Sequence, residues 1–397
     1  MSRRNELKYT LLQYLLLHGH ATRPELVAMT GVRAATVFEA VDELKDERII
    51  EEPERHGKKT GRRAPELYCA AKSCYVVGVE LRLTGCIGVV IDAVGNVLHS
   101  VEHASGARNT LLAVKREILE VLQHLRDLTG DEWHLVRGLG FADPGLVDVE
   151  RNRSIRAVNI PPWQELETGR MLENASGLPS QVWPEAMVKT RMEFLQRLPE
   201  APESIFNLVT DDGIGGGFVK KGELFIGKSG RAMEIGHIVV HPGGSRCQCG
   251  NCGCLESVAS PAGLAEKIAE SRMAGVDLGG LPENFSMKTF AEFAARNRGV
   301  RIIADQLCRD LAKALSVAVM LLNPEMIVIS GEFADLGEYL TSSLRRELEL
   351  RCFPESVREL KIEISTLKTS DTARGAAMMM RDLILLGETG KNENRCR

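Results

Sequence analysis

The feature that most constrains the fold is a pattern of strands that occurs twice in the chain. Residues 75–103 contain YVVGVEL, CIGVVID and VLHSVEH, which read as three β-strands joined by short turns. Residues 204–227 contain SIFNLVT, GIGGGFVKK and ELFIG, which repeat the order of strand, glycine-marked turn and hairpin. Two copies of one unit predict a duplicated α/β fold with a cleft between two lobes.

Apolar spacing after each copy predicts the elements that complete the lobes. The longest apolar runs, such as Leu315 to Leu322, are far shorter than the roughly 20 residues that span a bilayer. Hydrophobic residues make up 44% of the chain and charged residues 26%, as in a folded soluble protein, and we expect a cytoplasmic location. The expected elements are helices near 111–128, 261–275, 287–296, 299–322 and 335–350, the strands MIVISG and KIEIS, and a closing helix from Arg374.

The N-terminal 68 residues read as three short helices followed by a hairpin. The first helix has leucines at helical spacing and ends near Gly19. The second begins at a capping box formed by Thr22 and Glu25 and stops at Gly31. The third carries a buried stripe of Val37, Val41 and Leu44. This order is typical of a helix-turn-helix, and IIEEPERHGKKTGRRAPELYCA then reads as a two-stranded wing.

The tip of this wing is basic, which indicates a nucleic-acid partner. Residues 1–65 carry 12 Lys and Arg against 10 Asp and Glu, whereas the rest of the chain carries 38 against 44. We predict that the exposed positions of the third helix face the major groove, namely Arg33, Ala34, Thr36, Phe38 and Glu39. The carboxylate of Glu39 repels phosphate there and suits only a cytosine amino group. A helical bundle that binds a protein partner is the alternative. The residues expected at phosphates or the minor groove are Lys58, Lys59, Arg62 and Arg63.

Residues 236–256, GHIVVHPGGSRCQCGNCGCLE, hold four cysteines within eight positions. Their spacing is too tight for several mutual disulfides, whose geometry is narrow. In a reducing compartment, clustered thiolates with or without an imidazole point to tetrahedral Zn²⁺. The four cysteines Cys247, Cys249, Cys252 and Cys254 could supply every ligand, or a histidine could replace one of them.

Several motifs together make the chain resemble the ROK family, which groups transcriptional repressors with sugar kinases. They are FADPGLVD with NIPPW, GIGGGFVKKGELFIG, EIGHIVV followed by CQCGNCGCLES, NPEMIVISG and RGAAMM. The resemblance implies a two-lobed, actin-like, ribonuclease-H-like α/β fold of the ATPase type, and the winged helix-turn-helix matches the repressor branch. The expected domains are a DNA-binding domain over 1–70, a first lobe over 74–184 plus 371–390, and a second lobe over 185–370 with a zinc loop at 237–256.

The resemblance also implies site residues. A structural zinc ion would be held by His237, Cys247, Cys249 and Cys254, with Cys252 unligated and an all-cysteine site as the lesser alternative. Sugar hydroxyl groups would meet Glu234, His237 and Glu256. The base motif of the kinases aligns best with Pro184–Glu185–Ala186–Met187, which adds Glu185 to the sugar-binding candidates.

The phosphate loops of the family's kinases are altered in this sequence. The first loop reads Glu80-Leu81-Arg82-Leu83-Thr84 and has lost both glycines, and the second loop carries Asp211 and Asp212 in place of a glycine and a threonine. Fixed carboxylates oppose bound phosphate. We therefore expect no kinase activity.

The sequence thus predicts a sugar-responsive, DNA-binding transcriptional regulator of carbohydrate metabolism that acts as a repressor. It would work as a homodimer or homotetramer on a double-stranded operator, with a sugar or sugar derivative as effector. The rival hypothesis is an ATP-dependent sugar kinase.

Overall fold

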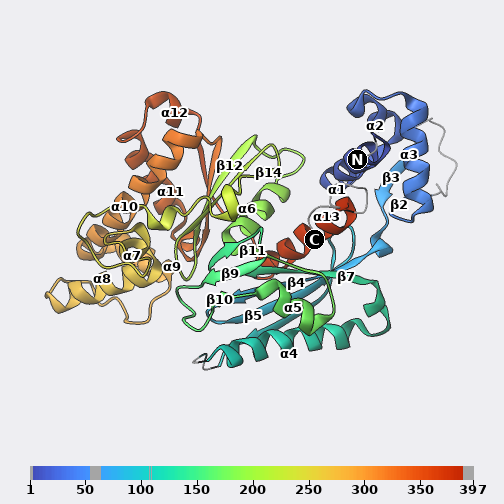
Figure 1. Cartoon of the computed structure of the whole chain (residues 1–397). Helices are drawn as coiled ribbons and strands as arrows, with labels where there is room; N and C mark the ends of the chain where they lie inside the picture. Colours follow the sequence, from blue (N-terminus) through green and yellow to red (C-terminus); the bar gives the residue numbers. More distant parts are fainter. Residues whose placement is uncertain (1–2, 54–63, 107, 109, 388–397) are drawn as a thin grey trace. The chain divides into compact units, whose positions relative to one another are not determined.

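The computed structural model describes residues 3–53, 64–106, 108 and 110–387 (Figure 1). The chain forms two compact units. Unit 1 comprises residues 1–155, 162–183 and 370–397, and unit 2 comprises residues 156–161 and 184–369. In the part of the chain that the structure describes, no helix is long and apolar enough to cross a membrane.

The N-terminal region of unit 1 forms the expected winged helix-turn-helix. Helices α1 (Arg3–His18), α2 (Arg23–Thr30) and α3 (Ala34–Asp46) share a small apolar core. Thr22 and Glu25 form the predicted capping box, and Gly31 ends α2 with a φ of 65°. Strands β2 (Ile50–Glu51) and β3 (Glu66–Cys69) make the wing. A strand that the sequence did not reveal, β1 (His20–Thr22), pairs with β3, so the sheet order is β1-β3-β2.

The main sheet of unit 1 has five strands in the order β11-β7-β4-β5-β6. The three predicted strands are β4 (Tyr75–Arg82), β5 (Gly85–Ile91) and β6 (Val97–Ala104), and they form an antiparallel meander. The sequence patterns did not identify β7 (Val136–Asp143), which pairs parallel to β4, or β11 (Ser180–Pro184).

Helices α4 (Leu111–Thr129) and α13 (Asp371–Leu386) cover opposite faces of this sheet. A Cβ atom on Gly78 would lie 1.9 Å from the carbonyl oxygen of Ala373 in α13, so only glycine allows this close approach. Gly88 lies against Val121 and Leu125 of α4. Because Gly78 pairs with Val89, the neighbouring Gly88 points to the other face.

A smaller sheet and one helix complete unit 1. Strands β8 (Leu146–Asp148), β9 (Arg153–Arg156) and β10 (Gln164–Leu166) pair in the order β10-β9-β8, and α5 (Thr168–Ser176) follows them. Strand β9 ends at Arg156, the first residue of unit 2.

The main sheet of unit 2 repeats this topology, with the order β14-β13-β12-β15-β16. Strands β12 (Ser204–Thr210), β13 (Gly215–Lys220) and β14 (Glu223–Leu224) form the antiparallel meander. Strands β15 (Met326–Gly331) and β16 (Lys361–Ile364) add parallel pairs. The predicted duplication is confirmed, although β14 is shorter than the strand expected over 223–227.

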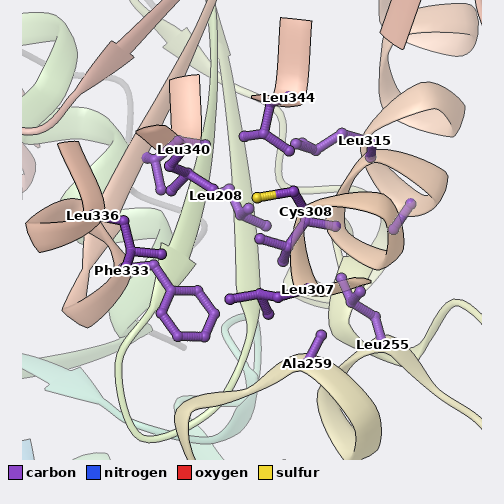
Figure 2. Close-up of a cluster of buried hydrophobic side chains, with 14 of the residues drawn as sticks. Leu208, Leu255, Ala259, Leu307, Cys308, Leu315, Phe333, Leu336, Leu340 and Leu344 are labelled. Atoms are coloured by element: carbon purple, nitrogen blue, oxygen red, sulfur yellow. The ribbon is translucent and has the colours of Figure 1, made fainter. Parts of the chain in front are cut away.

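Seven α-helices are described in unit 2, and several of them build its core. Figure 2 shows Leu208 of β12 among side chains of α10 and α11, and it places Leu255 and Ala259 of α7 beside Leu307. These contacts fix α7 against the core by one face. The helices are α6 (Glu185–Leu195), α7 (Leu255–Ala259), α8 (Pro261–Met273), α9 (Met287–Arg296), α10 (Arg298–Leu322), α11 (Gly337–Glu349) and α12 (Pro354–Arg358).

Candidate metal centre and neighbouring sites

The structure brings the four predicted metal ligands of unit 2 into one cluster. The ligand atoms of His237, Cys247, Cys249 and Cys254 all lie within 4.8 Å of one another. The Sγ atoms of Cys249 and Cys254 are 3.6 Å apart, and Sγ of Cys247 is 3.7 Å from Nδ1 of His237. Cys252 is exposed and stands outside this group.

These separations fit a tetrahedral metal site. Thiolates about 2.3 Å from a Zn²⁺ ion at tetrahedral angles would have sulfur atoms about 3.8 Å apart. Burial raises the pKa of Cys254 to about 12, so this thiol needs a nearby cation to ionise. The pKa of Cys249 is lowered, chiefly by the backbone N–H of Asn251. A soft divalent cation suits this donor set.

Backbone contacts hold the ligand loop in this shape. The N–H groups of Val240 and His241 both donate to the carbonyl oxygen of Gly253, at 2.8 and 3.1 Å. Gly253 has a φ of 75°, and a Cβ atom there would lie 1.6 Å from the carbonyl oxygen of His241. Glycine is therefore required between Cys252 and Cys254.

A buried carboxylate joins the same loop to α10. Asp310 is 1% exposed, and its Oδ1 lies 2.7 Å from Nε2 of His241. Lys313 and Gln306 donate to the same carboxylate. We call His241, Asp310 and Lys313 the α10 anchor. His241 thus attaches the loop to α10 and lies outside the ligand cluster.

Three of the four predicted sugar-binding residues lie beside the metal cluster. Glu256 sits in the first turn of α7, and its Oε2 accepts a hydrogen bond of 3.1 Å from the N–H of Ile214. Glu234 directly precedes the turn Ile235–His237 and is exposed. Although the residue is exposed, the protein atoms around its carboxylate desolvate it and raise its pKa. The charge of His237 lowers this pKa, and the charge of Glu256 raises it. Glu234, His237 and Glu256 therefore share one neighbourhood.

The fourth sugar candidate, Glu185, belongs to a separate ionic group in unit 2. Lys189 lies one helical turn after Glu185 in α6 and forms ion pairs with Glu185 and with Asp211, the latter at 2.5 Å. Burial raises the pKa of Glu185, Lys189 opposes this rise, and Asp211 adds to it. The sequence patterns did not single out Lys189, although its spacing of four residues from Glu185 was a visible signal.

The loop that carries Asp211 and Asp212 is rich in negative charge. Burial raises the pKa of Glu332, and the charges of Asp211, Asp212 and Asp335 raise it further. The backbone carbonyl of Asp212 accepts a hydrogen bond of 2.8 Å from the Asn159 side chain. Bound phosphate would meet like charges here.

The other predicted phosphate loop, in unit 1, is a tight β4–β5 turn. The guanidinium group of Arg108 donates to the carbonyl oxygens of Arg82 and Leu83. Its Nε also donates to Glu117 over 2.7 Å. The carbonyl groups of the turn thus bind a cation, whereas phosphate requires N–H donors.

Of the predicted DNA contacts, Arg33 and Thr36 are described and exposed. Arg33 is the residue that directly precedes α3, and Thr36 lies in its first turn. Lys58, Lys59, Arg62 and Arg63 lie outside the described residues.

Known proteins resemble this chain over most of its length. The glucokinase of Thermotoga maritima is 28% identical over 78% of this chain and 98% of its own. The xylose repressor of Caldicellulosiruptor bescii is 26% identical over 96% of this chain and 97% of its own. The DNA-binding transcriptional dual regulator NagC of Escherichia coli is 23% identical over 92% of this chain and 90% of its own.

A crystal structure of a ROK family transcriptional regulator, a homologue of the E. coli MLC protein, shares the fold. Its TM-score is 0.78 at 24% identity, and the match covers 93% of this chain and 94% of that one. The sequence profile of the ROK family matches residues 76–383. The repressors match nearly the whole chain, including its N-terminal helices, so the protein belongs to the ROK family, in its transcriptional-regulator branch.

Proposed function

We propose that this protein is a sugar-responsive, DNA-binding transcriptional repressor that lacks sugar kinase activity. The observation that carries the proposal is the winged helix-turn-helix of unit 1, whose third helix exposes its first turn. A helix presented in this way can enter the major groove. Two relatives that match nearly the whole chain support the same role, since one is a xylose repressor and the other, NagC, is a DNA-binding transcriptional regulator.

The absence of kinase activity is supported by the two loops that would have to cradle ATP phosphates. Asp211 and Asp212 put fixed negative charge on one loop. The ammonium group of Lys189 already forms ion pairs with Glu185 and Asp211. The other loop offers carbonyl oxygens to Arg108. Carboxylates on one loop and carbonyl oxygens on the other both face a phosphate with like charge or dipole, so both arrangements disfavour bound phosphate.

We further propose that His237, Cys247, Cys249 and Cys254 hold a structural Zn²⁺. When bound, the ion supplies a cross-link that fixes the loop before α7. The loop residues then position Glu256, whose carboxylate already accepts the N–H of Ile214. His237 can ligate through one ring nitrogen and leave the other for a hydroxyl group, since a neutral imidazole that binds a metal through one nitrogen carries an N–H donor on the other.

The proposed effector is a sugar or sugar derivative that contacts Glu185, Glu234, His237 and Glu256. Carboxylates and an imidazole accept and exchange hydrogen bonds with ring hydroxyl groups. The effector must bind the DNA-bound and free states unequally, because otherwise it could not shift the equilibrium between them. A homodimer or homotetramer would place paired winged helices on a two-fold symmetric operator.

Selection from genomic DNA tests this proposal. The purified protein is incubated with genomic fragments, the bound fragments are sequenced, and a panel of sugars is titrated against the resulting complex. We expect a palindromic site whose affinity falls steeply with salt and changes with one sugar. Recovery of no preferred sequence would contradict the proposal and favour a protein-binding role for the N-terminal helices.

A second candidate is an ATP-dependent sugar kinase, favoured by the 28% identity to the Thermotoga maritima glucokinase. Glu185 stands at the position expected for the base and could serve as one. Coupled ADP-release assays over hexoses and amino sugars decide between the two. Robust turnover that Glu185→Gln abolishes would establish the kinase and overturn our proposal.

A further inference from the structure

The first two turns of α3 present an exposed face that is mostly apolar. Val37, Ala40, Val41 and Leu44 are buried on the opposite side of the helix. The exposed residues, which we call the α3 reading face, are Ala34, Ala35, Thr36, Phe38 and Glu39. Three of these five side chains carry only carbon atoms beyond the backbone, and Thr36 adds a methyl group.

Most other acidic groups of α3 are neutralised by cations of the same domain. Arg23 lies 2.7 Å from Asp42. Glu43 forms ion pairs with Arg4 and Lys8. Glu39 therefore remains as the acidic residue of the reading face, and its carboxylate disfavours guanine, whose major-groove edge offers only acceptors.

Phe38 is held in place although its side chain is on the surface. The guanidinium group of Arg23 lies 5.4 Å from the centre of the Phe38 ring, and Arg23 is itself fixed by Asp42 and by Glu52 at 3.1 Å. Phe38 nevertheless remains 37% exposed. An aromatic ring that is positioned before binding loses little conformational entropy when it meets a partner.

In the major groove, the apolar group that distinguishes one base from the others is the C5 methyl of thymine. Alanine, threonine and phenylalanine are the side chains that contact this methyl group. We propose that the α3 reading face selects its operator through thymine methyl groups, with Phe38 as the principal specificity residue. This inference rests on the proposed DNA-binding function and names the base feature that the helix recognises.

Replacement of thymine by deoxyuridine tests the inference, because it removes the methyl group and changes no hydrogen bond. Each thymine of the selected operator is replaced in turn, and affinities of the full-length protein are measured at fixed salt. We expect at least one position in each half-site at which binding weakens by about fourfold, the value of one buried methyl group.

Two variants assign the effect to Phe38. Phe38→Ala should bind the thymine and deoxyuridine operators equally at that position. Met29→Ala is the matched control, because Met29 on α2 is also 37% exposed, and it should keep the discrimination. Unchanged circular dichroism of both variants shows that the domain is folded.

The outcomes separate the two claims. Tight binding to the selected operator with no loss at any deoxyuridine position would overturn this inference and leave the proposed function standing. If Phe38→Ala still binds the thymine operator more tightly than the deoxyuridine operator, Phe38 is not the principal specificity residue. Failure to select any DNA would overturn the proposed function and this inference with it.

Discussion

At the residue scale, two cysteines of the ligand loop differ in burial although their side chains are chemically identical. Cys252 and Cys254 are two residues apart, yet Cys254 is buried with the ligand cluster and Cys252 is exposed outside it. Gly253 lies between the two cysteines with a positive φ, so the backbone there is not a regular strand that would put both side chains on one side. The ligand set therefore follows from the backbone turn as well as from the thiols.

The first prediction concerns metal content. The wild-type protein and Cys252→Ser should each contain about one zinc per chain, whereas Cys254→Ser should contain almost none, because serine does not replace a zinc thiolate. Elemental analysis of protein purified without chelator provides the measurement. Equal zinc content in the two serine variants would contradict the assignment of Cys254 as a ligand.

The second prediction concerns pH and Asp143, which is fully buried in unit 1. Its carboxylate accepts hydrogen bonds from Trp163 Nε1 at 2.7 Å, from the Gly145 N–H at 2.8 Å and from the Ser154 hydroxyl. Burial raises its pKa, and the hydrogen bonds only partly oppose this. A raised folded-state pKa gives a stabilising contribution that is complete below the unfolded pKa and is lost as pH rises through the folded pKa.

The wild-type protein should therefore lose stability relative to Asp143→Asn as the pH rises above about 4, the ordinary pKa of an aspartate, because asparagine does not titrate. Urea unfolding followed by tryptophan fluorescence measures this in unit 1, which contains all three tryptophans, Trp133, Trp163 and Trp183. Asp127→Asn, on the exposed face of α4, is the control and should show no such trend. A constant difference between Asp143→Asn and the wild type at every pH would refute the prediction.

At the scale of elements, α10 acts as the support of the ligand loop. The α10 anchor joins the loop to a helix whose buried face lies in the core of unit 2. The loop itself contains only isolated β-bridges, Val239 with Cys254 and Arg246 with Cys252. Such a loop depends on its side-chain contacts for order.

The third prediction follows from this support. Asp310→Asn removes the charge that holds His241 and Lys313, and it should speed zinc release to a chromogenic chelator by about tenfold, the effect of losing one charged hydrogen bond. Asp305→Asn is the matched control, because Asp305 lies on the same helix and accepts from the Tyr339 hydroxyl. Equal release rates from both variants would show that the anchor does not support the loop.

At the scale of the whole molecule, the two proposed activities belong to different units. The winged helix-turn-helix lies in unit 1, and the metal cluster with its neighbouring carboxylates lies in unit 2. A transcriptional response requires a coupling free energy between them, which is reciprocal for the two ligands.

The fourth prediction separates DNA binding from its regulation. Removing the metal from the full-length protein by chelation should abolish the sugar response and leave operator affinity within about twofold, because no ligand residue belongs to the winged helix-turn-helix. Fluorescence anisotropy of labelled operator, with and without sugar, measures both properties. Re-addition of zinc should restore the response, and loss of DNA binding on chelation would show that the metal also supports the winged helix.

Sequence reasoning predicted the elements whose evidence is local. The meander strands, the capping box at Thr22 and the cysteine cluster each depend on residues a few positions apart, whereas the choice of His237 as a ligand came from the resemblance to the ROK family. Strands β7 and β11 were missed because their sequences, VRGLGFAD and SQVWP, are interrupted by glycine, charged or polar residues and proline, so neither forms an apolar run or a regular alternation.

The sequence by itself determined that the chain is a duplicated α/β body with an N-terminal winged helix, because the repeated order of strands and the helix-capping residues can be recognised in the sequence. Only the tertiary structure determined which charged side chains, far apart in the sequence, pair with one another at the candidate sites. Lys189 meets Asp211, and His241 meets Asp310 across 69 positions. The physical reason is that hydrophobic periodicity specifies which face of an element is buried, whereas the pairing of distant charges depends on how the packed elements align.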